Sequence, residues 1–293
     1  MEHRAEMGEF LRSRRARLTP QDVGLRAFGG RRRVPGLRRE ELAPLAGVSV
    51  DYYVRLEQGR RVNVSRTVLD ALATALRLTD SEREHLHNLA KPGRQSVAPR
   101  RVRPPVQHLL DAMGGVPAFV LGRRMDVLAW NDLACALMGD FAARERDARN
   151  MPWIIFMDPR SKELYSDWET VAKEVVAYLR LDAGKYPDDP RLAALVGELS
   201  VHSEQFRRWW AGHNVQEKVH GSKAFRHPVV GELTLDYESM ALPSDPDLIV
   251  VAYTAPPGSE SAERLRRLET GTNGRHRGGE PLGLPAFAGH DRA

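Results

Sequence analysis

A stretch of the chain at residues 39–58 limits the possible folds more than any other feature. It reads REELAPLAGVSVDYYVRLEQ, and its apolar residues recur at helical spacing on both sides of Gly47. Glycine adopts a positive φ at the lowest cost because it lacks a Cβ atom, so Gly47 suits a tight turn. The pattern predicts two short helices that cross at a steep angle and are joined by that turn, which is a helix-turn-helix.

Side chains of suitable size lie on both segments of this predicted helix pair. Ala43 is small where the two helices would approach closely, and Ser49 can cap the second helix. We assign the apolar contacts between the helices to Leu42, Ala46, Val48, Tyr53 and Leu56. A plain helical hairpin would satisfy the same spacing and is the alternative interpretation.

The charge of the chain is divided unevenly between its two halves. Residues 1–103 contain 22 Lys and Arg against 12 Asp and Glu, a net charge of +10, whereas residues 104–293 contain 22 against 27, a net charge of −5. A basic half attracts a polyanion. Without a motif, a solvated arginine-rich surface with no partner would be the better interpretation. Together with the helix pair, the charge predicts that the first half binds double-stranded DNA.

The rest of the first ninety residues is predicted to be helical. Residues 7–18 are amphipathic, and residues 19–35 break the pattern with Gly29, Gly30 and Pro35. Ser65 suits the N-cap of a helix whose buried face is formed by Val68, Leu69, Leu72, Ala73 and Leu76. Thr79 and Glu82 form a capping-box pattern for the next helix, with Leu86 and Leu89 facing inward. These features predict an all-α domain over residues 1–90.

Residues 91–105, KPGRQSVAPRRVRPP, have the proline-rich, basic composition of an extended linker. We expect a second domain over residues 106–270 and a disordered, glycine-rich tail over residues 271–293. Strands are predicted at residues 118–121, 125–130 and 248–253, the last of them central, and in the alternation of Leu233, Leu235 and Tyr237 with polar residues. Helices are expected at residues 131–139, 168–181, 190–199 and 203–212. This order predicts an α+β domain in which helices cover one side of an antiparallel sheet.

Longer stretches of the chain resemble a known family. Residues 34–65, VPGLRREELAPLAGVSVDYYVRLEQGRRVNVS, and residues 69–90, LDALATALRLTDSEREHLHNLA, resemble XRE-type helix-turn-helix regulators of the MmyB-like subgroup. PAFVLGRRMDVLAWN at 117–131, FRRWWAGHNV at 206–215 and HPVVGELTLDY at 227–237 are similar to the ligand-binding domain of that subgroup. The resemblance implies a PAS-like sensor domain, a role in transcription regulation, and a small lipophilic ligand of fatty-acyl type.

The recognition helix of such a module enters the major groove by its N-terminal end. The candidates for contacts with base edges are therefore Ser49, Val50, Asp51, Tyr52 and Arg55. Arg55 suits guanine, whereas Asp51 suits either a cytosine amino group or the positive end of the helix dipole. Phosphate contacts are assigned to Arg38, Arg39, Arg60 and Arg61. Arg31, Arg32 and Arg33 either add to these contacts or remain solvated.

The second half concentrates aromatic residues that can fill a core or line a pocket. The apolar pocket candidates are Phe119, Leu121, Trp130, Leu137, Phe156, Trp168, Phe206, Trp209, Leu235, Tyr237 and Tyr253. Asn131, Arg180 and His213 are candidates for holding a polar head group, with surface contacts or satisfied core groups as the alternative. We expect the helix that carries Phe206 and Trp209 to close a mostly apolar cavity.

Other functional classes are not expected from the sequence. His202, His213, His220 and His227 lack the spacing of a metal site, the lone Cys135 lies in an apolar helical pattern, and no cofactor motif is present. We therefore expect no enzyme, no metal and no cofactor. The chain also lacks an apolar run long enough to cross a bilayer, so a cytoplasmic protein is expected.

A homodimer is expected because one module reads few base pairs. The alternative is a DNA-binding protein whose second domain is an interaction or dimerisation platform without a ligand.

Overall fold

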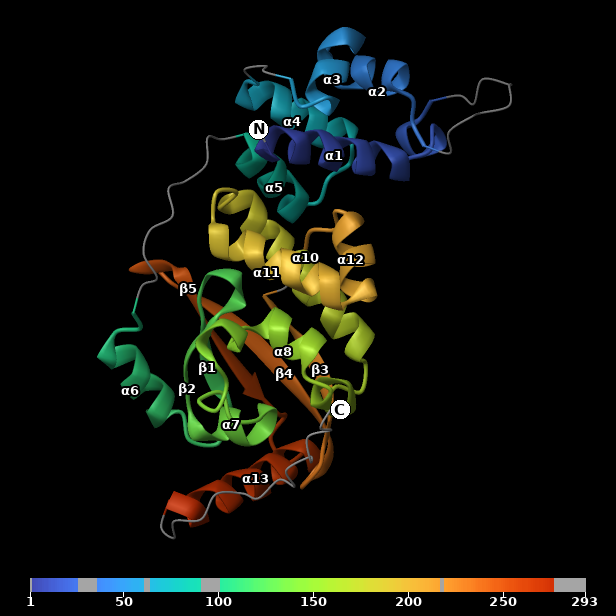
Figure 1. Cartoon of the computed structure of the whole chain (residues 1–293). Coiled ribbons are helices and arrows are strands. Elements are labelled where there is room, and N and C mark those ends of the chain that lie inside the picture. The colour runs from blue at the N-terminus through green and yellow to red at the C-terminus, as the bar shows by residue number, and fades with distance from the viewer. Residues whose placement is uncertain (1, 26–35, 61–63, 91–100, 217–218, 277–293) are drawn as a thin grey trace, which may run out of the picture.

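A computed structural model of the chain describes residues 2–25, 36–60, 64–90, 101–216 and 219–276 (Figure 1). The described chain forms a helical N-terminal module followed by an α+β domain with an antiparallel sheet, which confirms the predicted fold class. Gly29, Gly30 and Arg31 to Arg33 lie outside the described residues.

The N-terminal module consists of short helices whose ends follow the predicted capping signals. Its elements are α1 (Glu2–Arg17), the 3-10 turn η1 (Gln21–Val23), α2 (Arg39–Leu45), α3 (Val50–Glu57), α4 (Arg66–Ala75) and α5 (Asp80–Ala90). The hydroxyls of Ser49 and Ser65 accept hydrogen bonds from the first turns of α3 and α4. Thr79 and Glu82 exchange the two hydrogen bonds of a capping box at α5.

One apolar core holds this module together. Leu42, Tyr53 and Leu56 are fully buried between α2 and α3, and Gly47 takes the positive φ of 64° that the turn requires. The predicted helix-turn-helix packing is therefore confirmed. Two side chains from outside the module, Leu181 and Val215, are buried in the same core.

The second part is built on a five-stranded antiparallel sheet in the order β2-β1-β5-β4-β3. The strands are β1 (Ala118–Leu121), β2 (Val127–Trp130), β3 (His220–His227), β4 (Gly231–Leu242) and β5 (Asp245–Thr254). As predicted, β5 is central, and Leu233, Leu235 and Tyr237 of β4 alternate with exposed residues. The edge strand β3 has no counterpart in the sequence prediction.

Helices cover both faces of the sheet, which corrects the expectation of helices on one side. One face packs against α7 (Asp132–Met138), α8 (Met151–Met157), α10 (Trp168–Lys185) and α13 (Glu260–His276). The other face packs against α6 (Pro104–Ala112), through Val106 and Leu110. The remaining elements are η2 (Arg123–Met125), η3 (Arg146–Ala148), α9 (Arg160–Leu164), α11 (Pro190–His202) and α12 (Glu204–Ala211). The β1 and β5 side chains are buried on both faces for this reason.

Two segment ends differ from the sequence expectation. Pro104 and Pro105, which the composition placed in the linker, form the first turn of α6, where a missing N–H group costs nothing. At the other end, α13 continues to His276, six residues into the stretch expected to be disordered. Composition alone does not separate a linker from a helix that begins with proline, because proline suits the first turn.

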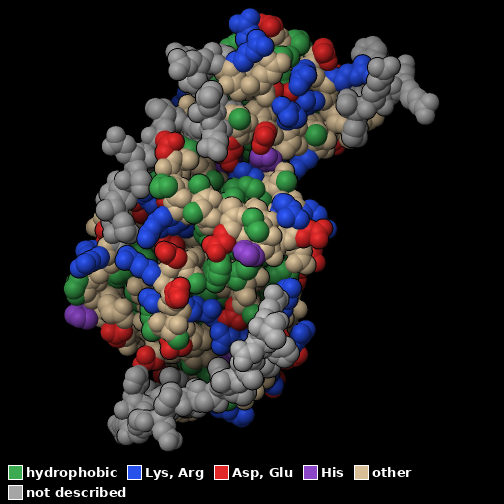
Figure 2. All heavy atoms as spheres, viewed as in Figure 1, with side chains coloured by type: hydrophobic (Ala, Val, Ile, Leu, Met, Phe, Trp, Pro, Cys, Tyr) green, Lys and Arg blue, Asp and Glu red, His purple; other side chains and the backbone are tan. Residues whose placement is uncertain are grey.

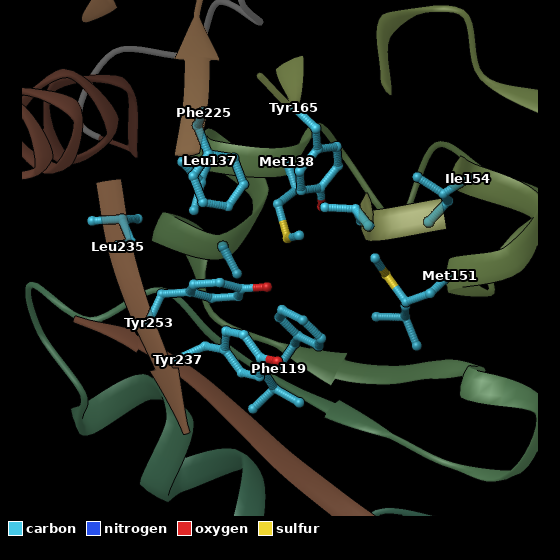
Figure 3. Close-up of a cluster of buried hydrophobic side chains, with 14 of the residues drawn as sticks. Phe119, Leu137, Met138, Met151, Ile154, Tyr165, Phe225, Leu235, Tyr237 and Tyr253 are labelled. Atoms are coloured by element: carbon cyan, nitrogen blue, oxygen red, sulfur yellow. The ribbon is translucent and has the colours of Figure 1, made fainter. Parts of the chain in front are cut away.

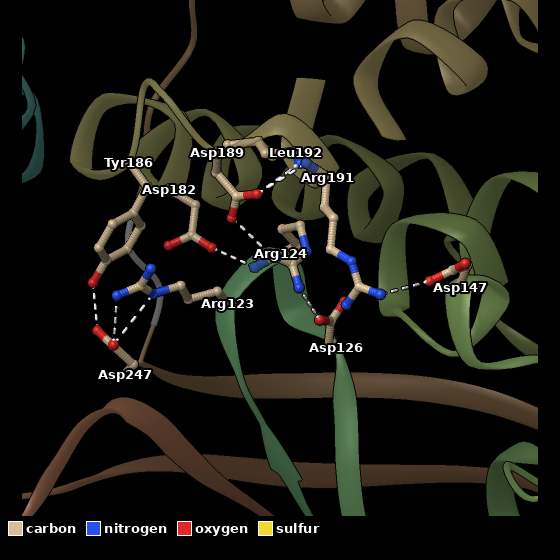
Figure 4. A network of polar contacts seen from close by, with 10 residues as sticks. All are labelled: Arg123, Arg124, Asp126, Asp147, Asp182, Tyr186, Asp189, Arg191, Leu192 and Asp247. Atoms are coloured by element: carbon tan, nitrogen blue, oxygen red, sulfur yellow. Dashed lines mark hydrogen bonds and ion pairs between the residues drawn. The ribbon is translucent and has the colours of Figure 1, made fainter. Parts of the chain in front are cut away.

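A network of charged side chains fastens the β1–β2 hairpin to the end of α10 (Figure 4). Arg124 and Met125 take positive φ values of 59° and 57°, which are strained for residues with a side chain. The backbone N–H of Arg124 donates to Asp182 at 2.5 Å, and its guanidinium pairs with Asp189 at 2.6 Å and with Asp126. These partners hold the hairpin in its strained form.

The two parts pack directly against each other through α1, α5 and the last turns of α10. A Cβ atom added to Gly184 of α10 would lie 2.5 Å from Nδ1 of His85 in α5, so the two helices touch at this point. Figure 1 shows α2 and α3 on the far side of the module from α10, α11 and α12. The predicted recognition helix is therefore not covered by the α+β domain.

Candidate functional site

The recognition helix α3 is anchored by its inner face and exposed along its outer face. Tyr53 and Leu56 are fully buried, whereas the side chains of Asp51 and Arg55 are 72% and 54% exposed. These two form an i,i+4 ion pair of 2.7 Å, which at such exposure is worth about 0.3 to 0.5 kcal/mol. The pair can therefore separate on DNA at little cost. Figure 2 shows Lys and Arg side chains at the end of the molecule that carries α2 and α3.

A buried carboxylate fixes the C-terminal end of α3. Glu57 has a fully buried side chain that accepts hydrogen bonds from Nε of Arg15 and from Nε of Arg39, both at 2.7 Å. Burial alone would raise the pKa of Glu57, but the bonds from Arg15 and Arg39 outweigh it and lower the pKa. The network ties α1, α2 and α3 into one rigid unit.

The other predicted DNA contacts differ in how far they reach solvent. Arg38, Ser49 and Arg60 are exposed, and Ser49 is also the N-cap of α3. Val50 and Tyr52 are half-buried against the module core. Arg39 keeps part of its side chain exposed while its Nε binds Glu57, so it has a structural role beside the predicted phosphate contact. Arg61 lies outside the described residues.

In the α+β domain, many of the predicted pocket residues meet in one buried cluster between the sheet and α7, α8 and α10. Figure 3 shows Phe119, Leu137, Leu235, Tyr237 and Tyr253 within it. Leu121 belongs to the same cluster, and Trp130, Phe156, Trp168 and Trp209 pack at its edge. Leu235, Leu137 and Phe119 are only 0%, 1% and 2% exposed. These side chains fill the core by packing on one another.

The rings of α12 pack against α8 and α10. Phe206 is fully buried, and Phe156 of α8 lies edge-on to it with ring centroids 5.2 Å apart. Trp209 lies 6.1 Å from Phe156 and 6.1 Å from Trp168. The expected cavity closed by Phe206 and Trp209 is occupied here by ring contacts.

A pocket does lie elsewhere in this domain, beside α7, α8 and α9. Its volume is about 20 Å³, and it is lined by Met138, Phe141, Met151, Ile154, Asp158, Arg160, Ser161, Leu164 and Tyr165. This volume is large enough for a water molecule but too small for a lipid chain. The lining contains none of the side chains assigned from the sequence. The apolar run MPWIIFM at α8 is the available signal, and Phe156 is its only residue among the pocket candidates.

Charged groups surround the polar side of this pocket. Asp158 pairs with Arg144 at 2.6 Å and with Arg160 at 2.8 Å, and the Arg160 side chain is 60% exposed. Burial would raise the pKa of Asp158, but the bonds from Arg160 and Arg144 lower it to about 2. Two arginines facing one carboxylate leave a net positive charge at this point.

Asn131 has a structural role in place of the expected head-group contact. Its Oδ1 accepts from the N–H groups of Ala118 and Ala134, and its Nδ2 donates to the carbonyl groups of Val116 and Leu110. These bonds cap α7 and join it to β1 and α6. The side chain is thus committed within the fold.

Arg180 and His213 lie at the contact with the N-terminal module, away from the sheet core. Arg180 binds Glu6 of α1 at 2.8 Å and stacks on the Trp210 ring at 3.8 Å. Nε2 of His213 lies 3.3 Å from Glu9 of α1. Both residues were assigned to a ligand because their true partners are far away in the sequence.

Comparison with known protein families agrees with both halves of this description. Residues 6–86 match a helix-turn-helix domain family, and residues 102–268 match the MmyB-like transcription regulator ligand binding domain. The chain belongs to this MmyB-like family. No curated protein matches the chain. The MmyB-like regulator combines a DNA-binding module with a ligand-binding domain, which makes it a ligand-modulated transcription regulator and confirms the resemblance seen in the sequence.

Among the residues that the structure describes, His, Cys, Asp and Glu side chains form no group of three or more that could hold a metal ion. Within the same described ranges, no helix is both long and apolar enough to span a membrane.

In the MmyB-like regulator, Arg55→Ala and Arg60→Ala are expected to act differently on DNA. Arg55 lies on the exposed face of α3, so its loss should cost about 1 to 3 kcal/mol on the preferred sequence and little on others. Arg60 follows the helix, and its replacement by alanine should weaken binding to all sequences alike. Titrations with a duplex selected from a random library and with its scrambled version measure both. Equal losses on the two duplexes for Arg55→Ala would exclude a base contact.

Proposed function

We propose that this MmyB-like regulator acts in the cytoplasm as a sequence-specific, homodimeric DNA-binding protein whose affinity is changed by a small lipophilic ligand. The ligand is of fatty-acyl type. Base edges are read by Ser49, Val50, Asp51, Tyr52 and Arg55, and phosphates are bound by Arg38, Arg39, Arg60 and Arg61. The observation that carries the ligand proposal is the pocket beside α8, which has apolar walls and a charged rim.

The walls of this pocket can adapt to a larger occupant. Figure 3 shows Met138, Met151, Phe119 and Tyr253 pointing toward one another between the sheet and the helices. Methionine side chains are unbranched and flexible, so Met138 and Met151 can move aside and open the volume toward the core cluster. The acyl chain then lies against Phe119 and Tyr253, which keeps these two predicted residues in the proposed site.

The rim selects an anionic head group. Arg144 and Arg160 already share Asp158, and the exposed part of Arg160 can bind a carboxylate. Guanidinium groups bind carboxylates through paired N–H donors, which gives both charge and direction. An amphiphile with one negative charge therefore fits the polar rim and the apolar wall together.

Dodecanoate is the probe for this proposal. We expect native mass spectrometry to show it bound, and we expect a saturating concentration to change the affinity for the selected duplex by about 5- to 150-fold. Met151→Trp should fill the pocket and abolish dodecanoate binding. Leu235→Trp is the matched control, because Leu235 is buried outside the pocket lining and overpacking there should cost about 1 to 3 kcal/mol of stability without blocking the pocket. A duplex affinity indifferent to dodecanoate would contradict the proposal.

The tight packing of Phe119, Leu137 and Leu235 favours a second candidate function. In this case the α+β domain is an interaction or dimerisation platform, and no small molecule enters it. Purified protein would then carry no lipid and respond to none. A monomeric mass in solution and on DNA, across micromolar concentrations, would contradict the homodimer in either case.

A further inference from the structure

The C-terminal end of α12 is bound by arginines from both parts of the molecule. The guanidinium of Arg14 donates a hydrogen bond to the carbonyl of His213, and that of Arg17 donates to the carbonyl of Gly212 at 3.4 Å. Arg180 donates to the carbonyl of Trp210. The Trp210 carbonyl lies in the last turn of α12 and the other two follow that turn directly, where the helix dipole places partial negative charge. Arg14 and Arg17 belong to α1, so the DNA-binding module caps a helix of the ligand-binding domain.

This cap depends on the position of α12. Arg14 is only 2% exposed, and besides the His213 carbonyl its charge is met by Glu82 at 3.3 Å. Burial lowers the pKa of Arg14 to about 10, more than Glu82 raises it. A buried cation is costly once a partner is removed. A small shift of α12 therefore changes the stability of the whole contact.

The other side of α12 packs against α8, the helix that lines the proposed pocket, through the ring of Phe156. Phe156 of α8 packs on Phe206 and Trp209 of α12. Two residues earlier on α8, Ile154 lines the pocket, and so does Met151. Helix α8 thus carries both part of the pocket wall and the ring that packs on α12, so the two are joined through one short helix.

The neighbouring contact through α10 has a different character. Leu181 of α10 is buried in the core of the DNA-binding module, and Gly184 of the same helix touches His85. This seam is closely packed, and the ion pair of Lys185 with Glu84 lies beside it, so it holds the two parts together. The charged cap on α12 is the contact that can change while the seam remains.

We propose that the capped end of α12 transmits the occupancy of the pocket to the DNA-binding module. An occupant displaces α8, Phe156 carries α12 with it, and Arg14 and Arg17 lose their carbonyl acceptors. The module is then free to reorient about the α10 seam. This inference rests on the proposed function for its ligand, and it assigns the route by which that ligand acts.

The first test removes one arm of the cap at an exposed position. Arg17 is 46% exposed and also donates to Asn214, so Arg17→Ala should leave the fold intact. We expect it to weaken the dodecanoate effect on duplex affinity by about threefold or more. Because dodecanoate would no longer have to break the Arg17 bond, Arg17→Ala should also bind dodecanoate more tightly in the absence of DNA. A merely structural role would not tighten binding at a distant pocket.

The matched control is Arg207→Ala. Arg207 is an exposed arginine of α12 that donates to the carbonyl of Ser200 within the same domain. It should leave both the dodecanoate effect and the dodecanoate affinity unchanged. If Arg17→Ala behaves like Arg207→Ala in both measurements, the cap does not transmit the signal.

The second test needs no ligand. Phe156→Leu removes the ring that packs on α12 and so loosens the position of that helix. It should change duplex affinity by about threefold or more in the wild-type protein, but not in the Arg17→Ala variant. Circular dichroism melting verifies that each variant is folded. The same response in both backgrounds, or none in either, overturns the proposal. If dodecanoate has no effect on the wild type while this cycle shows coupling, the ligand proposal fails and the route through α12 stands.

Discussion

Replacing Glu57 by alanine is expected to destabilise the DNA-binding module by about 3 to 5 kcal/mol. The carboxylate is completely buried and holds Arg15 of α1 and Arg39 of α2 at 2.7 Å each. Its removal would leave the Arg15 guanidinium, which is 12% exposed, without its counter-charge. Because domains are stable by about 5 to 15 kcal/mol, such a loss takes away much of the module's stability and, with it, DNA binding.

Urea unfolding followed by circular dichroism measures this effect on the full chain. Asp51→Ala is the matched control, since Asp51 is an acid of the same helix with a 72% exposed side chain. We expect the control to change the free energy of unfolding by less than about 0.5 kcal/mol. A Glu57→Ala protein as stable as Asp51→Ala would show that the buried network does not support α3.

Replacing Asp182 by asparagine is expected to stabilise the protein at pH 7 by up to about 3 kcal/mol. Burial raises the pKa of Asp182 to about 6, and the N–H of Arg124 and the charges of Lys185, Arg123 and Arg124 only partly offset this. At pH 7 the folded protein therefore carries a costly buried carboxylate. Asparagine is neutral and keeps an oxygen for the Arg124 N–H, and each pKa unit corresponds to about 1.4 kcal/mol.

The pH dependence gives this prediction its sign. Between about pH 4 and pH 6 the folded protein retains a proton on Asp182 that the unfolded chain has released. The contribution of Asp182 to stability is therefore complete below this window and is lost as the pH rises through it. Unfolding curves from pH 4 to pH 7.5 should show the advantage of Asp182→Asn growing with pH. Asp188→Asn, at an exposed position nearby, should show no such trend. A constant loss of stability for Asp182→Asn at every pH would contradict the prediction.

Local patterns were sufficient to predict the DNA-binding module. Ser49, Ser65 and the Thr79–Glu82 pair all form the predicted caps, because a cap depends on residues only three positions apart. The strands with apolar alternation or apolar runs were predicted because these patterns also lie within a few consecutive residues. β3 was missed because HGSKAFRH has few branched or aromatic side chains and owes its position to pairing with β4.

Contacts between distant segments could not be predicted in this way. Arg180 and His213 stood out as polar residues near aromatic ones, but their partners Glu6 and Glu9 lie at the opposite end of the chain. The pocket residues were missed because they come from three short helices whose arrangement no periodicity reveals. Whether the predicted DNA contacts and the predicted domain limits hold stays a prediction.

The apolar core that Leu181 and Val215 complete also bears on how such regulators can be recombined. A chimera that joined residues 1–90 to an unrelated sensor would lack both side chains and would expose apolar surface between α1 and α5. Supplying them means transferring the last turns of α10 and the segment after α12 as well. The unit that can be exchanged between chimeras therefore follows the packed surface, and it consists of three separate segments of the sequence instead of one.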